Sequence, residues 1–175
     1  MIIKKTKIKG VFIIDPSPFK DDRGIFRRNF CKDEMKIFIK NEKIMQANLS
    51  LNYKKFTLRG FHYQKGSKAE GKLLSCLNGE IYDAVLDLRK NSPTYLKTFE
   101  IKLSDKNMRS IFIPKGCANA FLTLKNNTLV HYYCTNKYNP KYENGIRFND
   151  PTFKIKWPNQ PKVISRKDKN WDNFL

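Results

Sequence analysis

The fold class follows from one stretch of sequence, Leu73-Leu-Ser-Cys-Leu77-Asn78-Gly79-Glu80-Ile81-Tyr-Asp-Ala-Val-Leu-Asp-Leu88. Two apolar runs of strand length flank an Asn-Gly pair, which is the strongest short signal for a two-residue turn. We therefore predict a β-strand on each side of Asn78-Gly79, with the two strands joined as a hairpin.

Similar strand-like segments recur on both sides of this stretch, at intervals of about 8–12 residues. They cover residues 9–14, 25–30, 45–50, 57–63, 99–103, 109–113, 120–124 and 129–134. Two short helices are also expected. Asp33 caps the first, with Met35 and Phe38 on one side, and a capping box over 165–168 opens the second, which runs through Phe174. This pattern predicts a mainly β sandwich or barrel with a few short helices.

The composition indicates one soluble domain over residues 1–175 with a strongly basic surface. The chain has 35 Lys and Arg against 16 Asp and Glu, a formal net charge of +19. Lysines recur from Lys4 to Lys169 without a block of five, which favours a solvated surface first and an anionic small ligand second. We expect no nucleic-acid partner, because no such motif occurs. We expect no membrane association either, because no apolar run approaches the roughly 20 residues that span a bilayer.

The cysteines and the N-terminus predict a cytoplasmic, reduced protein. Cys31, Cys76, Cys117 and Cys134 form no C-x-x-C pair and no zinc-ribbon spacing, so we interpret them as small buried thiols. The first residues carry lysines but no adequate apolar core or cleavage site of a signal peptide.

The chain has only two histidines, His62 and His131. A metal-binding β-barrel typically uses two or three histidines on one patch. His131 precedes Tyr132 on an expected strand, so their side chains point to opposite faces. We therefore expect no metal and no cofactor. His62 shares a face with Gln64, and the polar groups around it favour a functional role over a core histidine.

Several motifs follow one another in a recognisable order over nearly the whole chain. They are Asp21-Asp-Arg-Gly-Ile-Phe26, Gln46-Ala-Asn-Leu-Ser50, Leu58-Arg-Gly-Phe-His-Tyr-Gln64, Lys72-Leu73, Gly79-Glu-Ile-Tyr-Asp83, Ser92-Pro-Thr94, Ile113-Pro-Lys-Gly116, Asn149-Asp-Pro151, Trp157-Pro158 and Ser165-Arg-Lys-Asp168. In these segments the chain resembles the dTDP-4-dehydrorhamnose 3,5-epimerase family of nucleotide-sugar epimerases. The resemblance implies a cupin-type jelly-roll barrel and a role in capsule or lipopolysaccharide biosynthesis.

The resemblance implies four catalytic residues. His62 would be the base that removes a proton next to the 4-keto group of the sugar, and Asp168 would orient and polarise it. Tyr132 would be the acid on the opposite face of the sugar, and Lys72 would lie near the keto oxygen. These residue types suit the chemistry, because an enolate needs a cation at its oxygen and inversion needs a second proton donor.

The resemblance also implies a binding site for a nucleotide diphosphate. Arg59 would hold the diphosphate and Tyr138 would stack on the base. Arg23 and Phe26 would help bind the nucleotide from a partner subunit, in a homodimer that exchanges its N-terminal strand. Weaker candidates for the same pocket are Gln46, Asn48, Glu143 and Lys167.

Two positions depart from the family pattern. Asn119 stands where the family often has a histidine, so it can bind a hydroxyl but cannot carry a proton. Arg28 stands where the family often has a glutamate that accepts from thymine, whereas Arg only donates. This second difference tilts the expectation slightly from a dTDP-linked hexose toward a GDP-linked 4-keto-heptose. Inversion at C3, C5 or both stays open, and the alternative is a non-catalytic sugar- or nucleic-acid-binding jelly roll.

Overall fold

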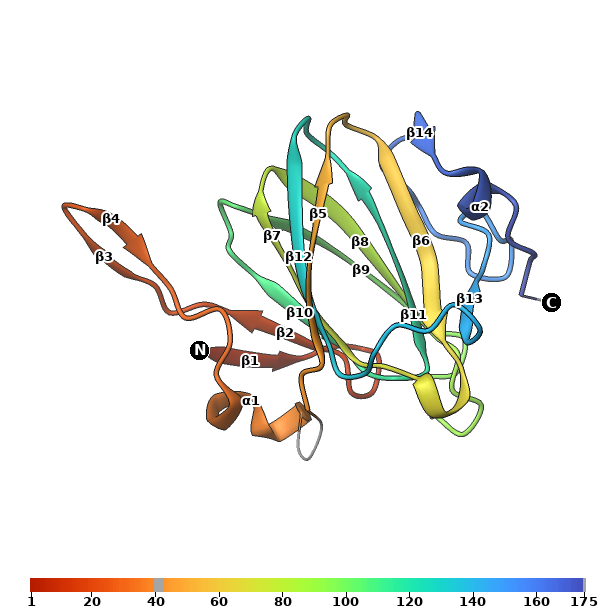
Figure 1. Ribbon diagram of the computed structural model, residues 1–175, viewed down its shortest axis with the longest axis horizontal. Coiled ribbons are helices and arrows are strands. Elements are labelled where there is room, and N and C mark those ends of the chain that lie inside the picture. The colour runs from red at the N-terminus through yellow and green to blue at the C-terminus, as the bar shows by residue number, and fades with distance from the viewer. Residues whose placement is uncertain (40–42, 175) are drawn as a thin grey trace.

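The computed structural model describes residues 1–39 and 43–174. Its strands form two stacked sheets and one short separate hairpin (Figure 1). The first sheet has the order β1-β2-β10-β7-β12-β5, and the second has the order β13-β6-β11-β8-β9 with β14 beside β6. The strands of the first sheet are β1 (Ile2–Lys5), β2 (Phe12–Asp15), β5 (Gln46–Asn52), β7 (Lys72–Asn78), β10 (Ser110–Ile113) and β12 (Thr128–Cys134). Those of the second are β6 (Thr57–Gln64), β8 (Glu80–Asp87), β9 (Thr98–Ser104), β11 (Cys117–Thr123), β13 (Glu143–Gly145) and β14 (Val163–Ile164).

The mainly β, cupin-type jelly-roll fold expected from the sequence is confirmed. The chain repeatedly crosses between the sheets, so that β5 and β6, β7 and β8, and β11 and β12 are consecutive in sequence but lie in different sheets. Such crossing connections build a double-sheet jelly roll rather than a simple meander.

The predicted hairpin at Asn78-Gly79 is wrong. β7 pairs with β10 and β12, whereas β8 pairs with β9 and β11. Gly79 does turn the chain, with φ +84°, and its N–H donates to Asp105 Oδ2 at 2.9 Å. The turn signal was thus correct, but the turn leads from one sheet to the other. Local chemistry reverses the chain here without pairing the strands that flank it.

The main core lies between the two sheets. Leu74, Ile111 and Val130 enter it from the first sheet, while Val85 and Phe121 enter it from the second. Alternate residues of β8 and β11 point to the other face of the second sheet, where Phe153 and other residues of the C-terminal segment cover them. Both faces of β8 are therefore buried, which explains its nearly continuous apolar sequence.

The first helix appears where the sequence predicted it, but Asp33 is not its cap: the helix begins at Lys32, the Met35 N–H donates to the carbonyl of Cys31, and Asp33 lies in the first turn. Helix α1 (Lys32–Ile39) buries Met35, Phe38 and Ile39 against the first sheet. Helix α2 (Arg166–Lys169) has the expected cap, in which the Asp168 N–H donates to Ser165 Oγ at 3.0 Å.

Helix α2 ends earlier than predicted, at Lys169. The residues beyond it have tertiary partners instead of helical ones. Arg147 Nε donates to the carbonyl of Trp171 at 3.0 Å, and the Phe174 N–H donates to Asp150 Oδ2 at 2.5 Å. No helix among residues 1–39 and 43–174 is long and apolar enough to cross a membrane.

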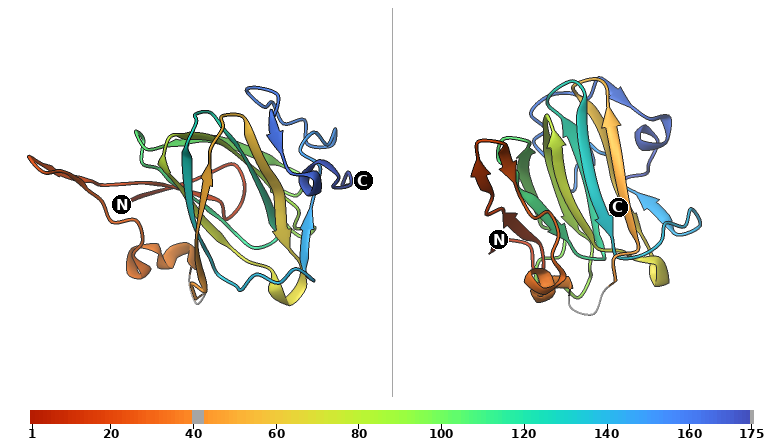
Figure 2. Two further views of the ribbon diagram at one scale, coloured as in Figure 1. Left: turned by 45° about the horizontal axis from the view of Figure 1, so that its top comes forward. Right: turned by 60° about the vertical axis from the view of Figure 1, so that its left-hand side comes forward.

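A hairpin of β3 (Phe19–Asp21) and β4 (Gly24–Phe26) projects away from the sandwich (Figures 1 and 2). The strand predicted over 25–30 therefore ends at Phe26, because residues beyond it turn back toward α1. Phe19, Ile25 and Phe26 are exposed by 63%, 50% and 71%, since the hairpin stands away from both sheets.

Candidate active site

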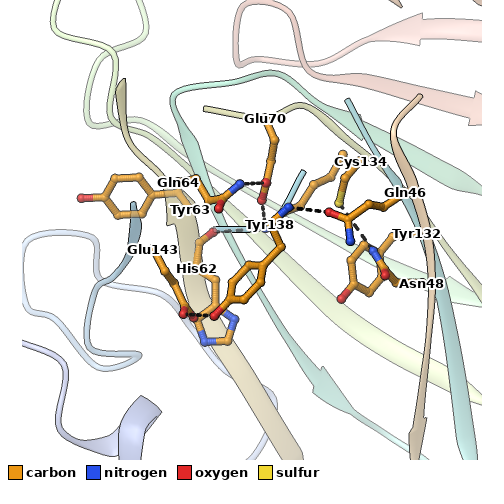
Figure 3. Close-up of a pocket in the computed structure, with 11 residues that line it drawn as sticks. Gln46, Asn48, His62, Tyr63, Gln64, Glu70, Tyr132, Cys134, Tyr138 and Glu143 are labelled. Atoms are coloured by element: carbon orange, nitrogen blue, oxygen red, sulfur yellow. Dashed lines mark hydrogen bonds and ion pairs between the residues drawn. The ribbon is translucent and has the colours of Figure 1, made fainter. Parts of the chain in front are cut away.

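Two adjoining cavities open between the sheets, on the side where β5 and β12 face β6. The first has a volume of about 370 Å³ and the second about 460 Å³. His62, Lys72 and Tyr132 line both cavities, so they mark the place where the two meet. Figure 3 shows His62 and Tyr132 reaching the first cavity from different strands.

His62 forms a short polar contact with Asp168. Its Nε2 lies 2.6 Å from Oδ1 of Asp168. Burial opposes ionisation of Asp168, but the hydrogen bonds from His62 and from the Gly60 N–H outweigh it and lower the pKa of that carboxyl. An ionised carboxylate only accepts, so Nε2 carries the hydrogen and donates it. The other ring nitrogen, Nδ1, is left as the basic atom of His62.

Gly60 allows this pair to form. Its φ of +118° lies in the left-handed region, and a Cβ there would come within 2.6 Å of Ala120 on β11. Without a side chain, the backbone of β6 lies close against β11, and the Gly60 N–H donates to Asp168 Oδ2 at 3.2 Å. Both carboxylate oxygens of Asp168 are thus hydrogen-bonded, Oδ1 to the His62 ring and Oδ2 to the backbone of β6.

Tyr132 and Lys72 come from the opposite sheet. Tyr132 is on β12, and burial raises the pKa of its phenol, so the hydroxyl keeps its proton at neutral pH. Lys72 opens β7, with its Nζ 3.4 Å from Glu70 Oε1 and 3.5 Å from the carbonyl oxygen of His62. A phenolic donor and an ammonium group therefore flank the same space as the imidazole.

The second cavity contains Arg59. Its Nε donates to Asn52 Oδ1 at 2.8 Å, which orients the guanidinium, and within residues 1–39 and 43–174 its two terminal nitrogens make no hydrogen bond. Arginine binds phosphate oxygens through such paired N–H groups.

Tyr138 also lines the first cavity, and Figure 3 shows its ring reaching toward Glu143. Its hydroxyl donates to Glu143 Oε2 at 2.5 Å, and Lys167 Nζ lies 2.5 Å from the same oxygen. Its backbone N–H donates to Gln46 Oε1 at 2.6 Å. Within this chain, Tyr138 and Glu143 therefore line the first cavity together with His62. Lys167 is joined to Glu143 by its ion pair, although it does not line the cavity.

Asn48 and Asn119 occupy opposite ends of the site. Asn48 lines the first cavity beside Cys134, with its Nδ2 3.8 Å from the cysteine sulfur. Asn119 lines the second cavity and donates its amide hydrogens to Asp83 Oδ1 at 2.8 Å and to the carbonyl of Ala84 at 3.3 Å.

Three predicted binding residues do not reach either cavity of their own chain. Arg23 and Phe26 are on the projecting β3–β4 hairpin, where Arg23 is paired with Asp21 at 2.6 Å. Arg28 follows the hairpin and is paired with Glu34 at 2.6 Å on an exposed surface. Their proposed role therefore depends on a second copy of the chain.

Sequence reasoning missed Glu70 and Asp83, and it did not assign Gln64 a role. The Nε2 of Gln64 donates to the carbonyl of Lys68 and to the carboxylate of Glu70. Its Oε1 accepts from the Asn139 N–H at 2.6 Å. Asp83 is a fully buried carboxyl group inside an apolar strand. That position was a usable signal, because aspartate is rarely fully buried.

His131 lines neither cavity. It contacts Asn29 through Nδ1 at 3.4 Å and lies edge-on to Tyr133. Burial and the nearby charge of Arg27 lower its pKa. Across residues 1–39 and 43–174, no three His, Cys, Asp or Glu side chains are grouped closely enough to hold a metal ion.

The family model described as dTDP-4-dehydrorhamnose 3,5-epimerase matches residues 5–175. The chain belongs to this family. It is accordingly an enzyme, an epimerase of the isomerase class. A dTDP-4-dehydrorhamnose 3,5-epimerase of Methanothermobacter thermautotrophicus is 41% identical to it over 173 residues, which cover 95% of this chain and 91% of the relative.

Solved structures of other epimerases share the fold over their full length. The Bacillus anthracis dTDP-4-dehydrorhamnose 3,5-epimerase, crystallised with TDP and PPi bound, has a TM-score of 0.94 and 33% identity, covering 98% of both chains. A dTDP-6-deoxy-D-glucose-3,5-epimerase of Legionella pneumophila in complex with dTDP-4-keto-L-rhamnose has a TM-score of 0.92 and 35% identity, covering 98% of this chain and 92% of that one.

Proposed function

We propose that this epimerase inverts C3, C5 or both in a dTDP-linked 4-keto-6-deoxyhexose, without a metal or cofactor, and that residues 1–175 form one epimerase domain. One observation carries the proposal: the Asp168-bound imidazole of His62 shares its cavities with the ammonium of Lys72 and the phenol of Tyr132. A base, an enolate-stabilising cation and a second proton donor are what epimerisation beside a ketone requires.

The proton transfers follow from the positions of these groups. His62 Nδ1 takes the proton from the carbon next to the keto group, and the electron pair of that C–H bond moves into the carbonyl to give an enolate. The ammonium of Lys72 stabilises the negative oxygen. The Tyr132 hydroxyl then protonates the carbon from the other face. Solvent returns a proton to Tyr132 and removes one from His62, so the enzyme is restored.

Lys72 is held ready for this role by its own contacts. Glu70 and the His62 carbonyl fix its Nζ on the side of the cavity where β7 begins. Gln64 in turn donates to Glu70, so the cation is supported by a chain of hydrogen bonds from β6. Support of this kind keeps a reacting group in place without reorganisation during the reaction.

We propose a dTDP-sugar as the substrate, instead of the GDP-sugar that Arg28 slightly favoured in the sequence analysis. The named activities of the similar epimerases are on dTDP-sugars, and Arg28 is exposed and engaged with Glu34 in this chain. Arg59 would bind the diphosphate, with Arg23 and Phe26 supplied by the partner subunit.

A homodimer is part of the proposal. The projecting hairpin carries exposed Phe19, Ile25 and Phe26, and the outer edge strand β5 exposes Leu49 by 66%. Apolar surface on a projecting hairpin and on a sheet edge favours burial against another chain. We take the β3–β4 hairpin as the exchanged N-terminal element. The cytoplasm and surface-polysaccharide synthesis remain the predicted setting.

Incubation in D₂O with dTDP- and GDP-linked 4-keto-6-deoxyhexoses tests the proposed reaction. Mass and NMR spectra should show deuterium at C3, C5 or both of the dTDP-sugar, with inverted product. Exchange confined to the GDP-sugar would overturn the nucleotide assignment. An absence of exchange with both sugars, despite tight nucleotide binding, would favour the non-catalytic jelly roll.

A further inference from the structure

Asn119 is fixed as a hydrogen-bond acceptor. Both amide hydrogens are engaged inside the protein, one by Asp83 Oδ1 at 2.8 Å and one by the Ala84 carbonyl at 3.3 Å. Among the described residues its carbonyl oxygen has no partner, and the side chain lines the second cavity. What Asn119 offers to a ligand is therefore a single carbonyl oxygen.

Asp83 holds the amide in this orientation. It projects from β8 into the space between the sheets and is completely buried, and its Oδ2 has no partner in the described part of the chain. Its Oδ1 accepts from Asn119 whether or not the carboxyl is protonated, because the proton can reside on the other oxygen. If the amide of Asn119 turned over, its oxygen would face the carbonyl oxygen of Ala84, which can only accept, and such an unpaired contact between buried oxygens is costly.

The strand register locates this acceptor along the ligand. Asn119 is opposite His62 on neighbouring β6, and Phe121 is opposite Arg59. Asn119 thus lies beside the base. It is two residues before Phe121, which lies beside Arg59, the proposed ligand of the diphosphate. In a hexose whose C1 carries the diphosphate and whose C3 faces a base, the carbon between them is C2.

We propose that Asn119 accepts a hydrogen bond from the 2-hydroxyl of the sugar, with Asp83 as its positioning residue, so that the epimerase selects sugars that keep this hydroxyl. The inference rests on the proposed function, because it uses the positions assigned to the diphosphate and the reacting carbons. A site built to bind a hydroxyl discriminates against the deoxy analogue, since its own polar group is then left unpaired.

The test compares a 2-hydroxy sugar with its 2-deoxy counterpart in two ways. Calorimetry gives Kd for dTDP-glucose and dTDP-2-deoxyglucose, which needs no turnover. Kinetics gives kcat/KM for dTDP-4-keto-6-deoxyglucose and its 2-deoxy form. The wild type should prefer the 2-hydroxy compound about tenfold or more in both. Failure of the proposed function would appear as no turnover of the 2-hydroxy substrate, while the binding ratio still reports on Asn119.

Asn119→Leu should reduce the preference to less than about threefold, because leucine cannot accept. Asn119→Ala gives the same answer with a smaller side chain if leucine impairs folding. Asp83→Leu should also reduce the preference, since leucine cannot accept the hydrogen bond that holds the Asn119 amide in its orientation. A merely structural role of Asp83 would lower the affinity for both sugars equally.

Asn48→Leu is the matched control, because it makes the same change at the other end of the site. It should leave the ratio between the two sugars unchanged, whatever it does to the affinity for both. A wild type without preference, or an Asn119→Leu variant with the wild-type ratio, would overturn the proposal.

Discussion

His62 Nε2 lies 2.6 Å from Asp168 Oδ1, although the two residues are 106 positions apart in the chain. The same carboxylate accepts from the Gly60 N–H, two residues before His62 on the same strand. This double contact holds the carboxylate of Asp168 against β6 and occupies Nε2 of the imidazole, while His62 lines both cavities. Asp168 on α2 thus positions the proposed base, His62, on β6.

Replacement of the base should stop proton removal. His62→Asn keeps a polar side chain but has no basic nitrogen, so deuterium exchange at both carbons should fall by about 10²–10⁴-fold. Exchange is measured by NMR in D₂O, with dTDP affinity as the control for an intact site. Normal exchange in this variant would place the base elsewhere.

Replacement of the acid should separate exchange from inversion. Tyr132→Phe keeps the ring and its packing but removes the phenolic donor. His62 can still take a proton and return one to the same face, so deuterium should enter faster than the carbon inverts. The two rates are read from one sample by mass and NMR spectra. Epimerisation at the wild-type rate would exclude Tyr132 as the acid.

Asp83 should make the protein less stable as the pH rises. Burial raises its pKa from the ordinary 3.8 to about 8, so between these values the folded chain binds a proton that the unfolded chain has released. The free energy of unfolding contributed by this proton is complete below about pH 4 and is lost as the pH approaches 8. From pH 5 to 8 the loss is about 4 kcal/mol, at about 1.4 kcal/mol per pH unit.

Asp83→Asn isolates this effect, because the amide does not titrate. Urea unfolding of both proteins at pH 5 and pH 8 gives the comparison, and the wild type should lose stability relative to the variant at the higher pH. Parallel changes in the two proteins would show that Asp83 is ionised in the folded state.

The projecting hairpin should hold the dimer together. Wild-type protein should have twice the 20.7 kDa chain mass in light scattering at micromolar concentration. Phe26→Asp should shift it toward the monomer and weaken dTDP binding, because the partner's hairpin would no longer reach the site. Ile37→Asp, at another exposed apolar residue (57% exposed, on α1), is the control and should remain dimeric. A monomeric wild type would contradict the exchange.

The sequence by itself determined most elements of the sandwich, helix α1 and the Ser165 cap, because apolar periodicity and turn chemistry act over a few residues. The motif order also indicated His62, Lys72, Tyr132 and Asp168, which line or support one site. Only the tertiary structure decided that β7 and β8 part at Gly79 and that Asp83 faces Asn119. Those contacts join residues far apart in sequence, and they depend on how two sheets pack, which no local pattern specifies.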